Sequence, residues 1–399
     1  MNRMHANEMR ECAHGDLVEH VQNVVDEFCD ERITEDRIRQ WCISCGVPEA
    51  EYRAFYESEL GKYCLPPTAG GFDGPFIARA ALVARLMRRA GATMPYLTDM
   101  TSMALLSTMR ILSQQEIAED LMSCNGRVAF SQAFSEGGQG ESGSVTTEVT
   151  VDEGGIFLDG VKTFVANGQY IPRTLVYTRD MVNGTADGGV SLWLVPIDEP
   201  GVSTFPLNTV GQEMLAPARI EFEHVKLNPD WQIQTEGKLP QMLERQYELG
   251  RILICASSLG LAQAAMDDVL ERCATHVSHG RNLGGIPQIQ QKVADMAVRV
   301  RAMDMLVARA AESVSNGADA DQQHLDCALM KYYVPKAATE VASEALQIFG
   351  GVGYTDDARV GRIWRDCRGN QIAQGTDEIM PHTVAKMLIK NCASRLVDF

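Results

Sequence analysis

The chain has 399 residues, of which 45% are hydrophobic and 22% charged, and its formal net charge is −17. This length indicates more than one packed core, and the composition is that of a soluble globular protein. The negative charge excludes a nucleic-acid backbone or an anionic membrane as a general partner. We identify no apolar signal core and no run long enough to span a bilayer, so we expect an unprocessed cytoplasmic protein.

Three segments differ in the spacing of their apolar residues. Residues 1–124 show helical spacing, whereas 125–236 show a period of two with Gly-Gly and Asn-Gly turns, which predicts an antiparallel β-domain. The helical period then returns over 237–399, where Pro335 is expected to kink one helix. We predict an α+β fold: an N-terminal all-α domain, a middle β-domain and a C-terminal four-helix bundle. Its four long helices are expected at 239–275, 288–315, 322–349 and 376–395.

The 11 cysteines favour reduced thiols, because their number is odd and they lie in apolar or helical surroundings. Cys42 and Cys45 form a lone CxxC with no second pair beside it. We interpret them as two thiols near one helix face rather than a redox or zinc site. His276 and His279 could ligate a metal, but no carboxylate cluster accompanies them, so no metal site is predicted.

The most specific pattern lies near the C-terminus, where glycine breaks follow an apolar helix end. It reads Gln347-Ile-Phe-Gly-Gly-Val-Gly-Tyr354, then Trp364-Arg-Asp366 and Gly375-Thr376-Asp-Glu-Ile379. Glycine lets another group approach the backbone closely, although a helix cap and turn without a ligand is the alternative. With the order of helical and β segments, this pattern resembles the acyl-CoA dehydrogenase family over essentially the whole chain.

The resemblance implies FAD as cofactor and an acyl-CoA or acyl-carrier thioester as substrate. It also implies an electron-transfer flavoprotein as redox partner and a homotetramer or mixed tetramer. The cofactor-binding positions that match the family's motifs are Gln132, Phe134, Ser135, Phe164, Ala166, His276, His279, Gln347, Gly350, Gly351, Thr376 and Glu378.

Several of these positions depart from the family's pattern. Ala166 lacks the usual hydroxyl, and His276 stands where relatives have an arginine on the FAD pyrophosphate. Histidine is largely neutral near pH 7, so it would bind phosphate more weakly. Glu141 occupies the place of a serine and would repel a pyrophosphate, so it either turns away, towards the substrate, or alters cofactor binding.

Glu248 and Arg251 match the acidic residue and the arginine of the family's D-x-x-R, which lines the acyl-CoA site. Arg251 lies in an apolar stretch, and a buried unpaired charge is costly. Its anion partner is either the substrate or an internal acid, and the sequence leaves both open.

The usual catalytic base is absent. The family's glutamate of Y-E-G-T is replaced by Gln374, and the alternative position on the long helix is Gly250. An amide cannot accept the proton, although the backbone N–H at 374 can still hold a carbonyl. Tyr247, one turn before Gly250, is the candidate substitute and is better suited to donate a proton than to remove one.

We therefore predict an acyl-CoA dehydrogenase-type oxidoreductase acting on CH–CH bonds, which interconverts acyl-CoA and 2,3-enoyl-CoA through FAD. One alternative is a catalytically silent subunit that completes a neighbour's FAD site. Another is a flavin-dependent monooxygenase or oxidase on the same fold, which would not need the base.

Overall fold

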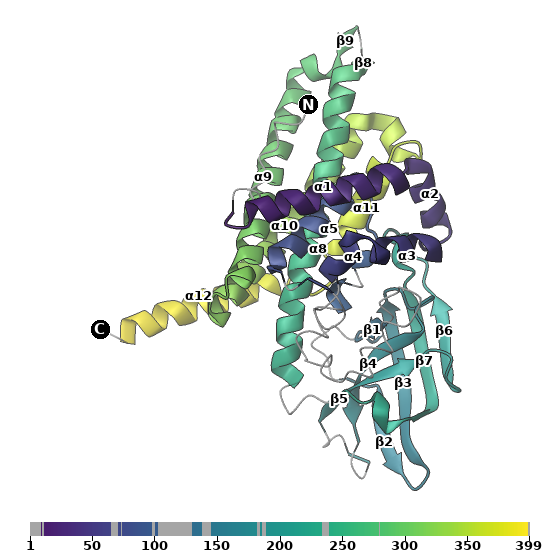
Figure 1. Cartoon of the computed structure of the whole chain (residues 1–399). Helices are drawn as coiled ribbons and strands as arrows, with labels where there is room; N and C mark the ends of the chain where they lie inside the picture. Colours follow the sequence, from purple (N-terminus) through teal and green to yellow (C-terminus); the bar gives the residue numbers. More distant parts are fainter. Residues whose placement is uncertain are drawn as a thin grey trace. The chain divides into compact units, whose positions relative to one another are not determined.

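The computed structural model describes residues 9, 12–64, 71–72, 74–97, 100–102, 130–137, 145–181, 184–185, 189–233, 239–278 and 280–397 (Figure 1). Two compact units divide the chain. The helical unit comprises Met1–Arg39, Asp73–Leu97 and Tyr247–Phe399, and the sheet unit comprises Gln40–Phe72 and Thr98–Gln246. The limits of the three domains expected from the spacing of apolar residues, 1–124, 125–236 and 237–399, stay a prediction.

The helical unit is built from helices that are distant in the sequence. α9 packs against α5 and α10, α10 against α11 and α12, and α1 against α5 (Figure 1). The elements in chain order are α1 (Gly15–Arg32), the start of α2 (Glu35–Ile43), α5 (Phe76–Ala90), α8 (Leu239–Thr275), the hairpin strands β8 (Val277–Ser278) and β9 (Arg281–Asn282), η6 (Leu283–Gly285), α9 (Pro287–Ser315), α10 (Ala320–Phe349), η7 (Gly350–Tyr354), α11 (Val360–Asn370) and α12 (Met380–Val397).

Capping residues explain where α10 begins and ends. The side chain of Asp319 accepts a hydrogen bond from Gln322 N at 3.0 Å at its N-terminus. Gly350, with φ of 67°, stops it at the other end in a conformation that favours glycine. The helix continues through Pro335, so the predicted kink site does not end it.

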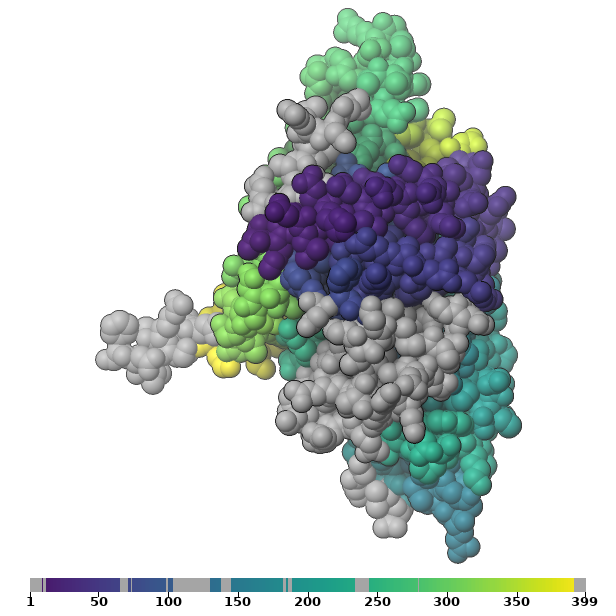
Figure 2. All heavy atoms as spheres, viewed as in Figure 1, coloured from purple at the N-terminus to yellow at the C-terminus, as the bar shows by residue number. Residues whose placement is uncertain are grey.

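α1 illustrates how the helical period sorts side chains. Its apolar Val18, Val21 and Val25 are buried, whereas exposed positions such as Glu19 and Glu27 are polar. Figure 2 shows this helix, in purple, on the surface of the molecule.

α8 corrects our expectation that no segment could span a bilayer. The stretch Glu244–Thr275 contains an 18-residue window with a mean hydropathy of 1.4, so it is long and apolar enough by composition. However, 89% of its most apolar window is buried inside the protein. A core helix that is apolar all round gives the same signal, because every face packs against protein.

Partly buried ion pairs join the start of α11 to α2 and α8. Arg362 donates to both carboxylate oxygens of Glu35, at 2.9 and 2.8 Å, and to the Gly91 carbonyl at 3.1 Å. Arg359 makes a similar two-bond pair with Asp268 at 2.9 and 2.8 Å. Burial would raise the pKa of Glu35, but the hydrogen bonds and charge of Arg362 outweigh it and hold that pKa below its ordinary value.

The sheet unit contains one seven-stranded sheet with the order β1-β4-β2-β3-β7-β6, and β5 pairs with β4. Its elements are α3 (Glu49–Glu57), α4 (Glu59–Cys64), β1 (Ser131–Ala133), β2 (Glu148–Asp152), β3 (Gly155–Val165), β4 (Arg173–Asp180), β5 (Val190–Pro196), β6 (Val202–Pro206), η4 (Glu213–Leu215), β7 (Ala218–Leu227) and η5 (Pro229–Trp231). β4 pairs parallel with β1 and β2, whereas the other pairings are antiparallel. The expected antiparallel character therefore holds for every pairing except those of β4 with β1 and β2. Alternation of apolar residues predicts which face of a strand is buried, but not the direction of the neighbouring strand.

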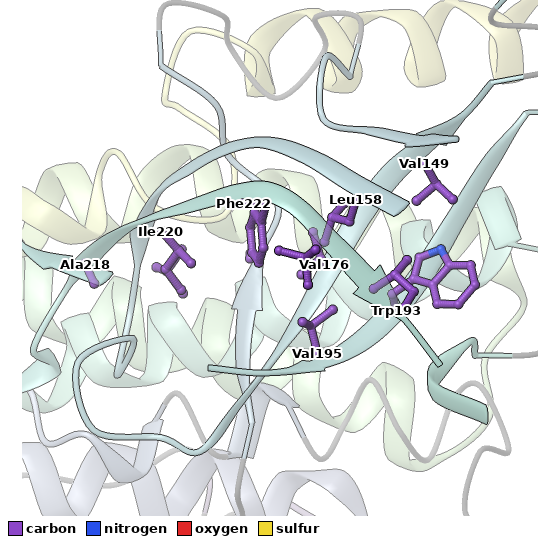
Figure 3. Packing of buried hydrophobic residues seen from close by; sticks show 12 residues of the cluster. Val149, Leu158, Val176, Trp193, Val195, Ala218, Ile220 and Phe222 are labelled. Carbon is purple, nitrogen blue, oxygen red and sulfur yellow. The ribbon is translucent and has the colours of Figure 1, made fainter. Parts of the chain in front are cut away.

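The core of the sheet unit lies along the buried faces of these strands (Figure 3). Trp193 on β5 is 2% exposed, and its Nε1 donates to Ser191 Oγ at 2.8 Å. The residues of this cluster labelled in Figure 3 are Val149, Leu158, Val176, Trp193, Val195, Ala218, Ile220 and Phe222.

Candidate functional site

The two possible base positions lie together in the helical unit. Gln374 sits in the loop between α11 and α12 with φ of 57°, followed by Gly375 with φ of 94°. A Cβ on Gly250 would lie 3.0 Å from Gln374 Oε1 and 3.3 Å from its Nε2. The Gln374 amide therefore packs against the backbone of α8 at Gly250. Positions 374 and 250, the two alternative places for the base, are thus neighbours in the fold.

Arg251 supports this loop from α8. Its Nε donates to the Gln374 carbonyl at 3.1 Å, and its Cζ lies 6.0 Å from the centre of the Tyr247 ring. A Cβ on Gly375 would lie 3.5 Å from Arg251 Nη2. Among the residues that the structure describes, no carboxylate oxygen lies within 4.0 Å of the Arg251 guanidinium. The internal ion pair left open by the sequence is thus not formed by any described acid.

Two buried oxygens in this loop have no described hydrogen-bond partner. They are Gln374 Oε1 and Asp377 Oδ1, whereas Asp377 Oδ2 accepts from Gln371 Nε2 at 2.7 Å. The backbone N–H of Gln374 also donates to no residue within the described part of the chain. Buried polar groups are normally paired, so the loop presents acceptors and a donor to a ligand or to water.

A buried polar layer lies under the loop. Lys331 is fully buried and donates to the Asn370 carbonyl at 3.1 Å, and Asn370 Nδ2 donates to Ser258 Oγ at 3.0 Å. Burial, only partly offset by Lys331, raises the pKa of the neighbouring Cys255 thiol to about 12. Cys255 is therefore a neutral thiol and does not replace the missing base.

Glu248 has a partner that sequence reasoning missed. His324 Nδ1 on α10 lies 2.9 Å from Glu248 Oε1, and both side chains are mostly buried. The residues are 76 positions apart and on different helices, so no local spacing could predict the pair. Glu248 thus faces α10 in the helical unit, while Arg251, Tyr247, Gly250 and Gln374 meet at the loop.

In the sheet unit, the predicted cofactor residues at the end of β1 are tied to neighbouring elements. Gln132 donates to Ser102 Oγ at 3.0 Å and accepts from Gln246 Nε2 at 3.1 Å. The Phe134 ring lies 5.8 Å from the Tyr177 ring. The Ser135 carbonyl accepts from Thr163 N at 2.9 Å, so this short segment is fixed against β3.

Phe164 on β3 keeps an aromatic ring in solvent, with 68% of its surface exposed and φ of 54°. This conformation is an outlier for a bulky residue, and such strain concentrates at functional sites. Ala166 is half-buried two residues further on. An exposed, rigidly held aromatic face is suited to packing against a flat ring.

Lys162 and Glu136 form a buried pair next to Phe164, which sequence reasoning also missed. Lys162 is fully buried, and its Nζ donates to Glu136 Oε1 at 2.7 Å and to the Phe134 carbonyl at 3.3 Å. Burial would raise the pKa of Glu136, but hydrogen bonds from Lys162 and from two threonines lower it to about 2. The sequence feature that could have indicated this pair is Lys162 in the G-x-K segment.

The remaining predicted cofactor residues belong to the helical unit. His276 is exposed just before the β8–β9 hairpin, and Gln347 is exposed near the end of α10. A Cβ on Gly350 or Gly351 would meet no atom within 4 Å. A hydrogen bond from Thr376 lowers the pKa of Glu378. The predicted residues Glu141 and His279 lie outside the described residues.

These residues fit FAD in two respects and depart in one. Phe164 offers an exposed aromatic face, and the backbone at Gly350 and Gly351 is open to close approach. The exposed His276 is a weaker phosphate ligand than the arginine it replaces. Taken separately, each unit thus offers a feature suited to part of a flavin dinucleotide, and His276 brings less positive charge to a pyrophosphate than an arginine would.

Comparisons with known proteins agree with the fold. Residues 131–225 match the family model of the acyl-CoA dehydrogenase middle domain, and residues 240–389 match that of the C-terminal domain. The probable acyl-CoA dehydrogenase YdiO of Escherichia coli is 29% identical over 348 residues, which cover 86% of this chain and 89% of the relative.

Solved structures are also similar. An acyl-CoA dehydrogenase from Slackia heliotrinireducens is 31% identical with a TM-score of 0.84, covering 95% of this chain and 97% of that one. A glutaryl-CoA dehydrogenase from Mycobacterium smegmatis, solved in complex with FADH2, is 18% identical with a TM-score of 0.77, covering 97% and 96%. At that identity only the fold is shared.

Together these matches confirm the resemblance and the fold class predicted from the sequence. The homologues are flavoprotein oxidoreductases that act on CH–CH bonds, which confirms the predicted enzyme class.

Proposed function

Because the chain belongs to the acyl-CoA dehydrogenase family, we propose that it is an FAD-dependent flavoprotein that interconverts acyl-CoA and 2,3-enoyl-CoA thioesters. The observation that carries this proposal is the loop at Gln374, which keeps its backbone donor while its side chain is no longer a carboxylate. We further propose a cytoplasmic homotetramer or mixed tetramer that exchanges electrons with an electron-transfer flavoprotein.

The loop is arranged to hold a thioester carbonyl. Arg251 bonds the Gln374 carbonyl oxygen at 3.1 Å, which restrains the loop on the C-terminal side of this residue, and the Gln374 N–H has no partner within the described residues. A fixed N–H donor stabilises negative charge that develops on a carbonyl oxygen. This chain therefore retains the group that acidifies or polarises the acyl end of the substrate.

The replaced side chain favours the reductive direction. Removing a proton from the α-carbon needs a base, and loss of a general base slows such a step by roughly 10²–10⁴-fold. Reduction of a 2,3-enoyl thioester instead needs a proton delivered to the α-carbon. Tyr247, whose ring centre lies 6.0 Å from Arg251 Cζ, is the residue we propose as its donor.

We propose that Phe164 in the sheet unit and, separately, Gly350, Gly351 and Thr376 in the helical unit contact FAD. When bound, FAD would supply the hydride exchange at the β-carbon. The chain's own residues would orient the thioester and control the proton at the α-carbon.

A catalytically silent subunit is the second candidate. Neutral residues occupy both base positions, Gln374 and Gly250, and His276 replaces the arginine for the pyrophosphate. Such a subunit would contribute its Gly350–Gly351 segment to a neighbour's FAD site while catalysing nothing itself.

The visible spectrum of the purified protein separates these functions. We expect a yellow protein with bound FAD, whose chemically reduced form is reoxidised anaerobically by an enoyl-CoA. A colourless protein that binds no added FAD would overturn the independent enzyme and favour the silent subunit. Bound flavin that ignores thioesters but consumes oxygen with another substrate would favour the oxygen-dependent alternative.

A further inference from the structure

Arg251 is a positioned cation with unused hydrogen-bond donors. Its Nε is bonded to the Gln374 carbonyl, its face lies against the Tyr247 ring and its Nη2 lies beside Gly375. Its two Nη nitrogens have no hydrogen-bond partner among the described residues. The hydrogen bond to Gln374 and the nearby Tyr247 ring orient the guanidinium, and its Nη donors stay available.

No described acid forms an ion pair with Arg251. Asp377 is engaged by Gln371 at 2.7 Å, and Glu248 is engaged by His324 at 2.9 Å. Lys331 adds a second buried positive charge under the loop. Asp377 and Glu378 keep their negative charges in this loop, but among the described residues neither of them bonds the Arg251 guanidinium.

Both positions that could carry a compensating carboxylate are neutral. Gln374 has an amide, and Gly250 has no side chain and leaves its space to that amide. A partly buried cation without a counter-ion is costly, so an anionic ligand gains from binding there.

We propose that Arg251 and the Gln374 amide bind a carboxylate carried on the acyl group, so that the preferred substrates are dicarboxylic acyl thioesters or their 2,3-unsaturated forms. The inference rests on the proposed function for the thioester part of the ligand. An arginine binds a carboxylate through paired charge-assisted hydrogen bonds, and Gln374 Nε2 is a further donor.

The glutamine is central to this inference. A glutamate at position 374 would pair with Arg251 and would repel a second carboxylate. The same substitution that removes the base therefore opens the site to an anionic acyl group.

The test compares thioesters that differ only in the terminal carboxylate. Binding of succinyl-CoA against butyryl-CoA, and of adipyl-CoA against hexanoyl-CoA, is measured by anaerobic calorimetry on the intact protein. We expect one dicarboxylic thioester to bind roughly ten- to a hundredfold more tightly than its neutral counterpart. Arg251→Gln and Gln374→Glu should each abolish the preference, whereas Arg299→Gln, which removes an exposed arginine on α9, should retain it.

Arg251 also holds the loop, so Gln374→Glu keeps the test decisive if Arg251→Gln misfolds. Equal affinities, a preference that survives in both variants, or no binding of any thioester would overturn the inference. A preference without any flavin reaction would support the carboxylate site and contradict the proposed function. A flavin reaction with thioesters, together with equal affinities for the dicarboxylic and neutral thioesters, would support the proposed function and contradict the carboxylate site.

Discussion

Two regions of the molecule hold a positively charged side chain in opposite ways. In the sheet unit, Lys162 is fully buried and bonds Glu136, which also accepts from the backbone of Thr146 and Thr147 at 2.8 and 3.0 Å. In the helical unit, Arg251 bonds the carbonyl oxygen of the neutral Gln374 and, within the described residues, no carboxylate.

The difference shows which charge serves the fold and which serves a ligand. A fully paired buried charge gains nothing from a ligand, and breaking it leaves an uncompensated ion. A positioned cation that has no carboxylate partner can form charge-assisted hydrogen bonds with an anionic ligand. We therefore assign Lys162 to the stability of the sheet unit, where it bonds Glu136 and the Phe134 carbonyl, and Arg251 to substrate binding.

The largest expected effect comes from restoring the carboxylate beside Arg251. Gln374→Glu should raise acyl-CoA dehydrogenation by roughly 10²–10⁴-fold, because the backbone donor is present and only the base is missing. Anaerobic flavin bleaching by acyl-CoA measures this gain. Gln288→Glu, an exposed change of the same charge, should leave the rate unchanged. Equal rates in the wild type and Gln374→Glu would show that the base lies elsewhere.

Breaking the paired region should cost stability. Lys162→Met should lower the free energy of unfolding by about 3–5 kcal/mol, because Glu136 is left buried and unpaired. Urea unfolding measures the loss, and Lys226→Met on the exposed edge of β7 is the matched control. A loss below about 1 kcal/mol would place the pair among weak surface ion pairs.

Acid should weaken the same pair. The folded-state pKa of Glu136 is about 2, below its ordinary 4.5, so its ionisation favours the folded protein above pH 4.5. This contribution is lost as the pH falls from about 4.5 towards 2. Unfolding curves over that range should show a steeper loss of stability in the wild type than in Glu136→Gln. Parallel curves would contradict the assigned pKa.

The smallest effect concerns the contact between Gly250 and Gln374. Gly250→Ala should change the free energy of unfolding by at most about 1 kcal/mol, because the helix favours alanine while the new Cβ crowds a flexible amide. The displaced amide should weaken thioester binding a few-fold, as measured by calorimetry. If a folded Gly250→Ala variant binds the thioester as tightly as the wild type, the Gln374 amide does not contact the ligand.

The sequence predicted local periodicity better than contacts between distant segments. The limits of α8 and α9 were predicted within a residue, since an apolar period of 3.6 is a local property. The parallel pairing of β4 and the buried character of α8 were not predicted, because neither depends on local spacing alone.

The candidate site shows the same division. The motifs identified Gln374, Gly250 and Arg251 as site residues. They did not predict that the Gln374 amide fills the space beside Gly250. The pairs Glu248–His324 and Lys162–Glu136 join different elements and could be found only in three dimensions.

The central claim is that position 374 no longer removes a proton, and exchange at the α-carbon tests it most directly. The protein is incubated with an acyl-CoA in deuterated water, and deuterium at the α-carbon is followed by mass spectrometry. Our account predicts no exchange above background for the wild type and clear exchange for Gln374→Glu. Wild-type exchange as fast as that of the variant would contradict it.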